Sequence, residues 1–175
     1  MIIAIGGVSR SGKSTLAQNL QTMIGGNSTH IEQDDYIVAP EALPKIKDRT
    51  DWESPFSIDW SRFETSIQQA SHNYAVVTVT GFLVFYQATI NVLYDHRFLI
   101  RLDYDQFLER RAQDTRWQHL EPGTEQRWYQ EHVWASYLRF GKPNEGLKYH
   151  TLIQQSPKEM LAETISLLDL EMNLL

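Results

Sequence analysis

The sequence predicts an α/β fold in which helices cover both faces of a parallel sheet. Two observations predict it. Short apolar segments suited to buried strands alternate along the chain with longer segments whose apolar residues recur at helical spacing. The clearest of these strand segments, residues 75–79, is also β-branched and continuous, as expected when both faces of a sheet are covered by helices. At 175 residues the chain is long enough for one domain with a sizeable core, so we expect a single domain over residues 1–175.

Five segments are the expected strands. Residues 75–79 form the clearest one, because they are β-branched and continuous. Residues 1–5 and 97–102 are also apolar, 29–32 are a weaker candidate, and 146–153 hold the last strand.

Helical spacing accounts for most of the remaining chain. A first helix carries Leu16, Leu20 and Ile24 on one face. Asp59 can cap a second, and Ser156-Pro157-Lys158-Glu159 form a capping box before the closing helix. Two further helices are expected at 104–116 and 125–140. Residues 39–57, which have no clean period, are expected as an irregular excursion long enough to be functional.

Residues 7–14 carry the clearest functional signal. They read Gly-Val-Ser-Arg-Ser-Gly-Lys-Ser and fit the pattern G-x-x-x-x-G-K-[ST] between a strand and a helix. Glycines let several backbone N–H groups point into one concavity that suits a polyphosphate. Lys13 adds positive charge near the β- and γ-phosphates, and the Ser14 hydroxyl can ligate Mg²⁺. We therefore expect ATP to bind Gly7, Val8, Ser9, Arg10, Ser11, Gly12, Lys13, Ser14 and Thr15.

Two other segments are expected at the same edge of the sheet, because ligands of such sheets bind beyond the carboxyl ends of the strands. One is the turn 33–36, where Asp34 and Asp35 could contact Mg²⁺ or accept a proton from a hydroxyl. A solvated acidic turn is the alternative for this pair. The other segment is the turn that begins at Thr80 and Gly81.

Cations for a transferring phosphoryl group are available further along the chain. Arg110 and Arg111 are adjacent on a predicted helix and so point in different directions, and Arg116 lies at the start of a loop. Arginines beside a loop can close over phosphates and exclude water. A solvated charged helix is the alternative.

Composition limits the other function classes. The net charge of −6 argues against a broad nucleic-acid surface. With no cysteine the chain has neither disulfides nor thiolate metal sites, and no other cluster has the spacing of a zinc site. No apolar run is long enough to span a membrane, and the N-terminus lacks a signal peptide, so we expect a cytoplasmic protein with access to ATP.

The tryptophans and one tyrosine form an aromatic-rich set. We expect most of them to pack in the core, and one or two to stack on a flat base. His132 is expected more as a packing residue than as a catalyst. The aromatic candidates are Trp52, Trp60, Trp117, Trp128, Tyr129 and Trp134.

With these motifs in place, the chain resembles the nicotinamide riboside kinases, within the uridine kinase group of P-loop nucleoside kinases. The matching segments occur in family order across nearly the whole chain: Gly7–Leu16, the Gln-Asp-Asp-Tyr turn 33–36, Gly-Phe-Leu-Val-Phe at 81–85, Arg110-Arg111 and His-Val-Trp-Ala-Ser-Tyr-Leu at 132–138. The resemblance implies the three-layer P-loop NTPase fold, with a five-stranded parallel sheet and a mobile lid at about 112–126. It also implies ATP-dependent phosphorylation of a nucleoside 5′-hydroxyl.

The resemblance further implies roles for individual residues. Asp34 takes the position of the proton acceptor and metal contact, and Ser14 that of the magnesium-binding hydroxyl. Glu53, with Asp51 as its neighbour, takes the position that helps hold the sugar. Lid arginines fall on Arg110, beside the nucleotide, and Arg111, beside the substrate, with Arg116 less securely matched. We accordingly expect Lys13, Asp34, Arg110 and Arg111 in catalysis, and Asp34, Asp35, Tyr36, Glu53 and Arg111 at the substrate.

One position departs from the family pattern. The family usually has Glu directly before Gly-Phe-Leu, and this chain has Thr80. Asp35 could compensate, or activity could be altered. The leading expectation is therefore a kinase for nicotinamide riboside. The alternatives are a uridine/cytidine kinase, a kinase for another small alcohol, and a nucleotide-binding module with weakened catalysis.

Overall fold

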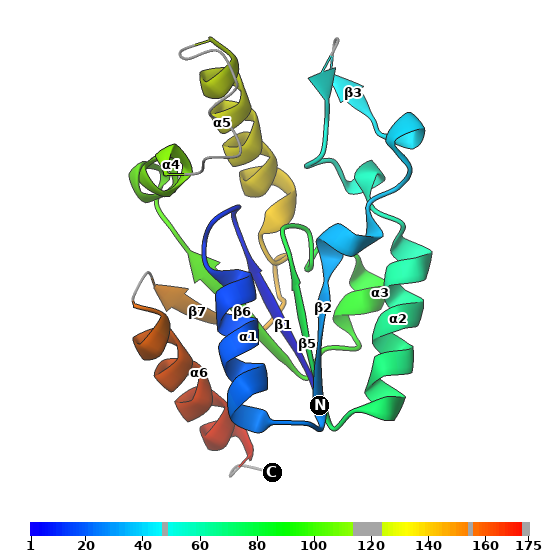
Figure 1. The fold of residues 1–175 in the computed structure, drawn as a ribbon, viewed down its shortest axis with the longest axis vertical. Helices are drawn as coiled ribbons and strands as arrows, with labels where there is room; N and C mark the ends of the chain where they lie inside the picture. Colours follow the sequence, from blue (N-terminus) through cyan, green and yellow to red (C-terminus); the bar gives the residue numbers. More distant parts are fainter. Residues whose placement is uncertain (47–48, 114–123, 154–155, 173–175) are drawn as a thin grey trace.

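The fold is built on a five-stranded parallel sheet with strand order β2-β5-β1-β6-β7. A computed structural model describes residues 1–46, 49–113, 124–153 and 156–172. The strands are β1 (Ile2–Gly7), β2 (Ser28–Glu32), β5 (Val76–Gly81), β6 (His96–Arg101) and β7 (His150–Ile153), so all five predicted strands are confirmed. Figure 1 shows the N-terminus and the last described turn of the C-terminal helix on one side of the sheet, opposite the carboxyl ends of the strands.

Helices cover both faces of the sheet, which confirms the predicted three-layer α/β arrangement. On one face Ile3 and Ile5 of β1 pack with apolar residues of α1 (Lys13–Ile24) and α6 (Pro157–Met172). On the other face Ala4 shares a core with residues of α2 (Trp60–Asn73), α3 (Ala88–Asn91), α4 (Tyr104–Ala112) and α5 (Thr124–Ser136). Side chains alternate between the two faces along a strand, so β1 belongs to both cores.

The helix caps follow the sequence. The Asp59 carboxylate accepts a hydrogen bond from the Arg62 amide at 3.0 Å. The Ser156 hydroxyl accepts one from the Glu159 amide at 3.3 Å, while the Glu159 carboxylate accepts one from the Ser156 amide at 3.0 Å. Helix α5 passes into a π-helical turn at Tyr137–Gly141, and α3 has no counterpart among the predicted helices. Arg116, Trp117 and most of the predicted lid at 112–126 lie outside the described residues.

The excursion at 39–57 is more regular than expected. It contains the short antiparallel strands β3 (Lys45–Ile46) and β4 (Arg49–Thr50), with 3₁₀ turns at Pro40–Ala42 and Pro55–Ser57. These pairs were missed because two-residue strands are too short to show a hydrophobic period. Figure 1 shows this hairpin and α5 rising on opposite sides above the carboxyl edge of the sheet.

Within the described ranges, every helix is too short or too polar to cross a bilayer.

Candidate active site

The phosphate loop connects the end of β1 to the start of α1. Gly12 precedes the first helical residue and has φ of 102°, in the left-handed region that favours glycine. A backbone hydrogen bond from the Ser11 amide to the Val8 carbonyl, at 3.1 Å, closes the turn inside the loop. The helix N-terminus therefore opens directly onto the loop, where unpaired amides and the helix dipole favour an anion.

Lys13 is held inside this loop. Its ammonium group donates to the Val8 carbonyl at 3.1 Å. Burial lowers the pKa of Lys13, and the negative charges of Asp34 and Glu32 act in the opposite direction. A polyphosphate in the loop would add further negative charge beside the amine, which favours the charged form.

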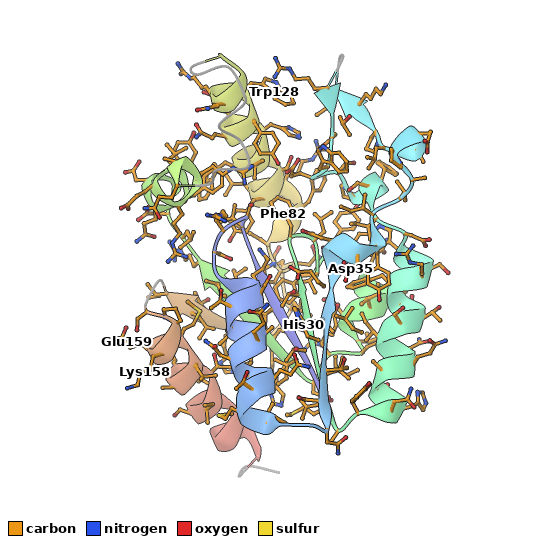
Figure 2. All side chains as sticks on the ribbon, viewed as in Figure 1. His30, Asp35, Phe82, Trp128, Lys158 and Glu159 are labelled. Atoms are coloured by element: carbon orange, nitrogen blue, oxygen red, sulfur yellow. The ribbon has the colours of Figure 1, made fainter. Side chains whose placement is uncertain are left out.

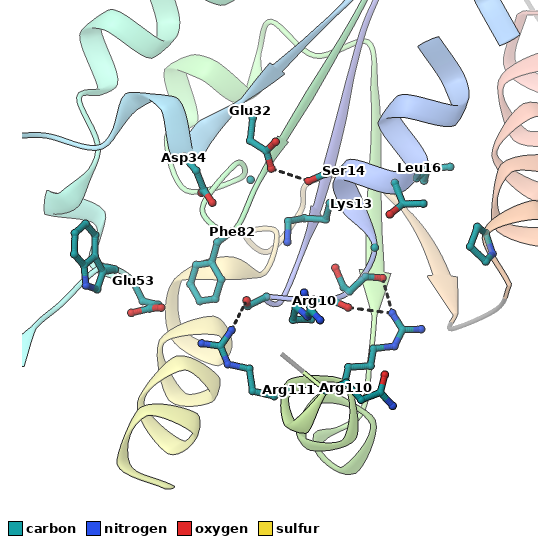
Figure 3. Close-up of a pocket in the computed structure, with 18 of the residues that line it drawn as sticks. Arg10, Lys13, Ser14, Leu16, Glu32, Asp34, Glu53, Phe82, Arg110 and Arg111 are labelled. Atoms are coloured by element: carbon teal, nitrogen blue, oxygen red, sulfur yellow. Dashed lines mark hydrogen bonds between the residues drawn. The ribbon is translucent and has the colours of Figure 1, made fainter. Parts of the chain in front are cut away.

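Two carboxylates from the end of β2 face the loop. The Ser14 hydroxyl donates to Glu32 Oε1 at 2.6 Å, and Glu32 is the last residue of β2. Asp34 lies one turn further on, in the 3₁₀ helix Gln33–Tyr36, and points into the same pocket (Figure 3). Glu32 was overlooked in the sequence. The sequence feature that could have identified it is a charged residue at the end of a strand, directly before the acidic turn.

Gln33 fixes the acidic turn against the neighbouring strand β5. Its side chain is buried, and its Oε1 accepts a hydrogen bond from the Leu83 amide at 2.8 Å. Gly81 makes room for this contact, because a Cβ there would lie 2.4 Å from Gln33 Oε1. The Gln-Asp-Asp and Gly-Phe-Leu motifs therefore pack against each other, and this contact sets the position of Asp34.

Asp35 and Tyr36 are not brought to the pocket. The Asp35 carbonyl accepts a hydrogen bond from Arg62 of α2, and the Tyr36 ring packs on Phe63 with centroids 5.1 Å apart. Neither residue lines the pocket, and Figure 2 shows Asp35 next to α2.

Thr80 is buried at the end of β5, where the family pattern has a carboxylate. Its hydroxyl lies 2.8 Å from His30 Nε2, and it pairs in register with Glu32 on the neighbouring strand. Register partners in parallel strands have their side chains on the same face of the sheet. A hydroxyl and a carboxylate therefore stand side by side at this edge, beneath α1.

Arg110 and Arg111 reach the two sides of the phosphate loop, as their adjacent positions predict. Arg110 Nη1 donates to the carbonyls of Arg10 and Ser11, each at 3.1 Å. Arg111 Nη1 donates to the Ser9 hydroxyl at 3.2 Å, and its guanidinium stacks over the Tyr129 ring at 4.7 Å. Figure 3 shows the two side chains diverging from α4 around the loop.

The opposite end of the pocket has two carboxylates beside it, with the Arg111 guanidinium nearby. Tyr129 of α5 donates to Glu53 Oε1 at 2.9 Å, and His132 Nε2 lies 2.8 Å from Asp51 Oδ1 and 3.8 Å from Glu53 Oε2. Glu53 Oε2 is buried and accepts no hydrogen bond from the residues that the structure describes. Burial raises the pKa of Glu53, with the Tyr129 hydrogen bond and His132 acting against it.

Three of the five candidate aromatic residues that the structure describes pack rather than face the pocket. Trp60 and Trp134 lie against the core on the side of α2 and α5. Trp128 stacks on His132 at 5.1 Å, outside the pocket lining. Trp52 and Tyr129 do line it, and Trp52 is 43% exposed. His132 does more than pack, since it lies against Asp51 and Glu53 of the excursion.

These groups border one pocket of about 690 Å³. Its phosphate-loop end is formed by Ser9, Arg10, Ser11, Gly12, Lys13, Ser14, Thr15, Glu32, Asp34 and Arg110, with Pro157 and Met160 beside them. Its hairpin end is formed by Ile37, Trp52, Glu53, Phe82, Arg111 and Tyr129. Gly7 and Val8 complete the loop behind this lining.

The oxygen atoms at the phosphate-loop end suit a hard divalent cation. Ser14, Glu32 and Asp34 offer a hydroxyl and two carboxylates, the ligands that Mg²⁺ prefers. A second set of possible ligands, Asp51, Glu53 and His132, has its ligand atoms within 4.8 Å of one another. The spacing of these residues along the sequence does not reveal this set, because Asp51 and Glu53 lie in the excursion and His132 lies in α5.

The fold and this pocket define a P-loop kinase-like protein. A sequence profile of the chloramphenicol phosphotransferase-like proteins matches residues 1–126, and the chain belongs to this family.

Curated relatives include nicotinamide riboside kinase 1 of Homo sapiens, which is 21% identical over 90% of this chain and 84% of its own. Nicotinamide riboside kinase 2 of Mus musculus is 25% identical over 83% and 82%. The predicted resemblance to P-loop nucleoside kinases, and with it the phosphotransferase class, is confirmed.

Solved structures of similar fold include a gluconokinase from Sinorhizobium meliloti, with a TM-score of 0.64 and 17% identity over 98% of this chain and 94% of that one. A possible uridine kinase from Bacillus stearothermophilus has a TM-score of 0.55 and 15% identity over 87% and 88%. These likenesses confirm the P-loop NTPase fold.

Proposed function

We propose that the chain is an ATP-dependent kinase that phosphorylates the 5′-hydroxyl of a riboside, with nicotinamide riboside as the first candidate. One observation carries the proposal. A single pocket joins a complete phosphate loop to the partly buried Glu53–Tyr129 pair, with Asp34 on its wall. The kinase relatives support the same reaction class.

The reaction follows from this placement. Residues 7–15 hold the triphosphate, and Lys13 lies beside its terminal phosphates. The bond between the γ-phosphorus and the bridging oxygen breaks, the acceptor oxygen bonds to that phosphorus, and ADP leaves. Asp34 takes the proton of the acceptor hydroxyl. Arg110 and Arg111 neutralise charge on the transferring group.

Magnesium fits the oxygen ligands at this end. Ser14 and Asp34 would hold it, and when bound it neutralises the charge of the phosphate oxygens.

The hairpin end favours a cationic acceptor. Nicotinamide riboside carries a positive charge on a flat ring. Asp51 and Glu53 supply negative charge next to the pocket, and Trp52 and Tyr129 supply aromatic faces on which such a ring can stack. Uridine and cytidine are neutral and would gain less from these charges, so a pyrimidine nucleoside is the second candidate.

Two other candidates remain open to the same assay. Membership of the chloramphenicol phosphotransferase-like family favours small alcohols generally as acceptors. A nucleotide-binding module with weakened catalysis would explain Thr80 in place of a carboxylate.

Riboside-dependent release of ADP from MgATP tests the proposal. The panel consists of nicotinamide riboside, uridine, cytidine, gluconate and chloramphenicol. Reduced nicotinamide riboside is the matched control, because it has nearly the same shape without the ring charge. We expect the charged riboside to have the highest kcat/KM, and its reduced form to lose at least tenfold. Calorimetric ATP binding without ADP release for any acceptor would favour the binding module instead.

A further inference from the structure

Glu32 occupies a position that the proposed reaction has not yet used. It ends β2, its Oε1 accepts a hydrogen bond from the Ser14 hydroxyl at 2.6 Å, and it lines the pocket next to Lys13. Figure 3 shows its carboxylate between Asp34 and the start of α1.

The hydrogen bond from Ser14 to Glu32 determines the direction in which the lone pairs of the Ser14 oxygen point. A serine hydroxyl has one proton to donate and two lone pairs that accept or ligate. Because the proton is directed to Glu32, the lone pairs of Ser14 are left for the pocket. A partner that orients a ligand in this way tunes metal binding without replacing the ligand.

The neighbouring strand offers no equivalent charge. Thr80 pairs in register with Glu32 on the same face of the sheet, but its side chain is a neutral hydroxyl engaged with His30. The closest carboxylate to Ser14 at this sheet edge thus comes from β2 and not from β5.

We propose that Glu32 is a positioning residue that aims the Ser14 oxygen at the divalent cation of the bound nucleotide and supplies the negative charge that Thr80 lacks. This inference rests on the proposed function. It gives the chain a complete cation site despite the departure at Thr80.

A purely structural role for Glu32 predicts something different. A carboxylate beside the first turn of α1 also stabilises the helix dipole. That role would change the melting temperature, whereas a positioning role changes how much Mg²⁺ strengthens ADP binding. The ratio of the ADP dissociation constants without and with Mg²⁺ therefore separates the two roles.

Calorimetry of ADP binding, without and with Mg²⁺, is the test. We expect Glu32→Ala to reduce the Mg²⁺-dependent strengthening by about 10- to 100-fold, while ADP alone binds within a few-fold of wild type. Glu32→Gln keeps an acceptor oxygen for Ser14 and should lose less. Glu145→Gln, an exposed acid before β7, is the charge control. Melting temperatures verify that each variant is folded.

Three results would overturn one or both proposals, or show that one holds while the other fails. An unchanged Mg²⁺ effect in Glu32→Ala would overturn the role of Glu32 alone. No Mg²⁺ effect in the wild-type protein would overturn both the role of Glu32 and the proposed donor site. A lost Mg²⁺ effect in Glu32→Ala together with no riboside turnover in wild type would support Glu32 and reject the acceptor.

Thr80→Glu provides an independent check. If Glu32 already supplies the charge, a second carboxylate beside it adds repulsion, and neither Mg²⁺-dependent binding nor turnover should rise. A tenfold gain in either would show that the cation site lacks a carboxylate, and would overturn the proposal.

Discussion

The two ends of the pocket are built in different ways. At the phosphate-loop end, one continuous segment, residues 9–15, supplies most of the lining, and the end of β2 and the turn after it add Glu32 and Asp34. At the hairpin end, Glu53 comes from the excursion, Tyr129 from α5 and Arg111 from α4. The first end is a local motif on a rigid strand and helix, and the second is assembled from distant segments.

This difference separates the part of the pocket that binds any nucleoside triphosphate from the part that selects the acceptor. The phosphate-loop end binds a group common to all nucleoside triphosphates, and backbone amides suffice for it. The hairpin end must distinguish acceptors, so it relies on side chains whose charges and hydrogen bonds are particular to this chain. Variants at the first end should therefore affect kcat, and variants at the second end KM for the acceptor.

The largest expected effect is at Asp34, which lies where the two ends meet. Asp34→Asn removes the group that takes the acceptor proton and should lower kcat by about 10²- to 10⁴-fold. ADP release at saturating riboside measures it, with Asp105→Asn on α4 as an exposed control. A loss of less than threefold would mean that another group takes the proton.

Lys13→Met should have the next largest effect. Removing the ammonium group from the phosphate loop should lower kcat by about 10²- to 10³-fold and weaken MgATP binding, with little change in riboside binding. The exposed Lys148→Met serves as the control. Unchanged MgATP binding, measured by calorimetry, would contradict the assignment of this end to the triphosphate.

Glu53→Gln sharpens the comparison at the hairpin end. The amide keeps the shape and the Tyr129 contact but loses the negative charge, so KM for nicotinamide riboside should rise about 10- to 100-fold. MgATP affinity and KM for a neutral riboside should hardly change. A KM effect equal for charged and neutral acceptors would show that charge at Glu53 does not select the acceptor.

The smallest expected effect is a change with pH in the melting temperature of a Glu53 variant relative to wild type. Burial raises the pKa of Glu53 above its ordinary value of 4.5, so the folded state holds this proton more tightly than the unfolded state. That stabilisation is complete below the ordinary pKa and is lost as pH rises through the raised one. The melting temperature of Glu53→Gln relative to wild type should therefore rise over this range. A constant difference across pH would contradict it.

The sequence predicted the sheet and the phosphate loop because both leave local patterns. Continuous apolar strands, helical spacing and a glycine loop ending in Lys13 and Ser14 can each be read within a short window. The packing of Gln33 against Gly81 could not be predicted from the sequence, because it is a contact between segments at the ends of different strands.

The hairpin end was predicted only in part. Glu53 was identified through the resemblance, but its partners were not, since His132 lies 81 positions from Asp51 and Tyr129 lies 76 from Glu53. Glu32 was missed for a related reason. Its charge at the end of a strand is visible in the sequence, but its importance comes from a contact with Ser14, which lies 18 positions away.

The most direct measurement is a crystal structure with ADP, Mg²⁺ and nicotinamide riboside bound together. We expect the β-phosphate within hydrogen-bonding distance of the Lys13 ammonium group, the 5′-hydroxyl at Asp34, and the charged ring between Trp52 and Tyr129. A riboside bound elsewhere, or a phosphate loop without nucleotide while Asp34 points away from it, would contradict a single pocket that joins donor to acceptor.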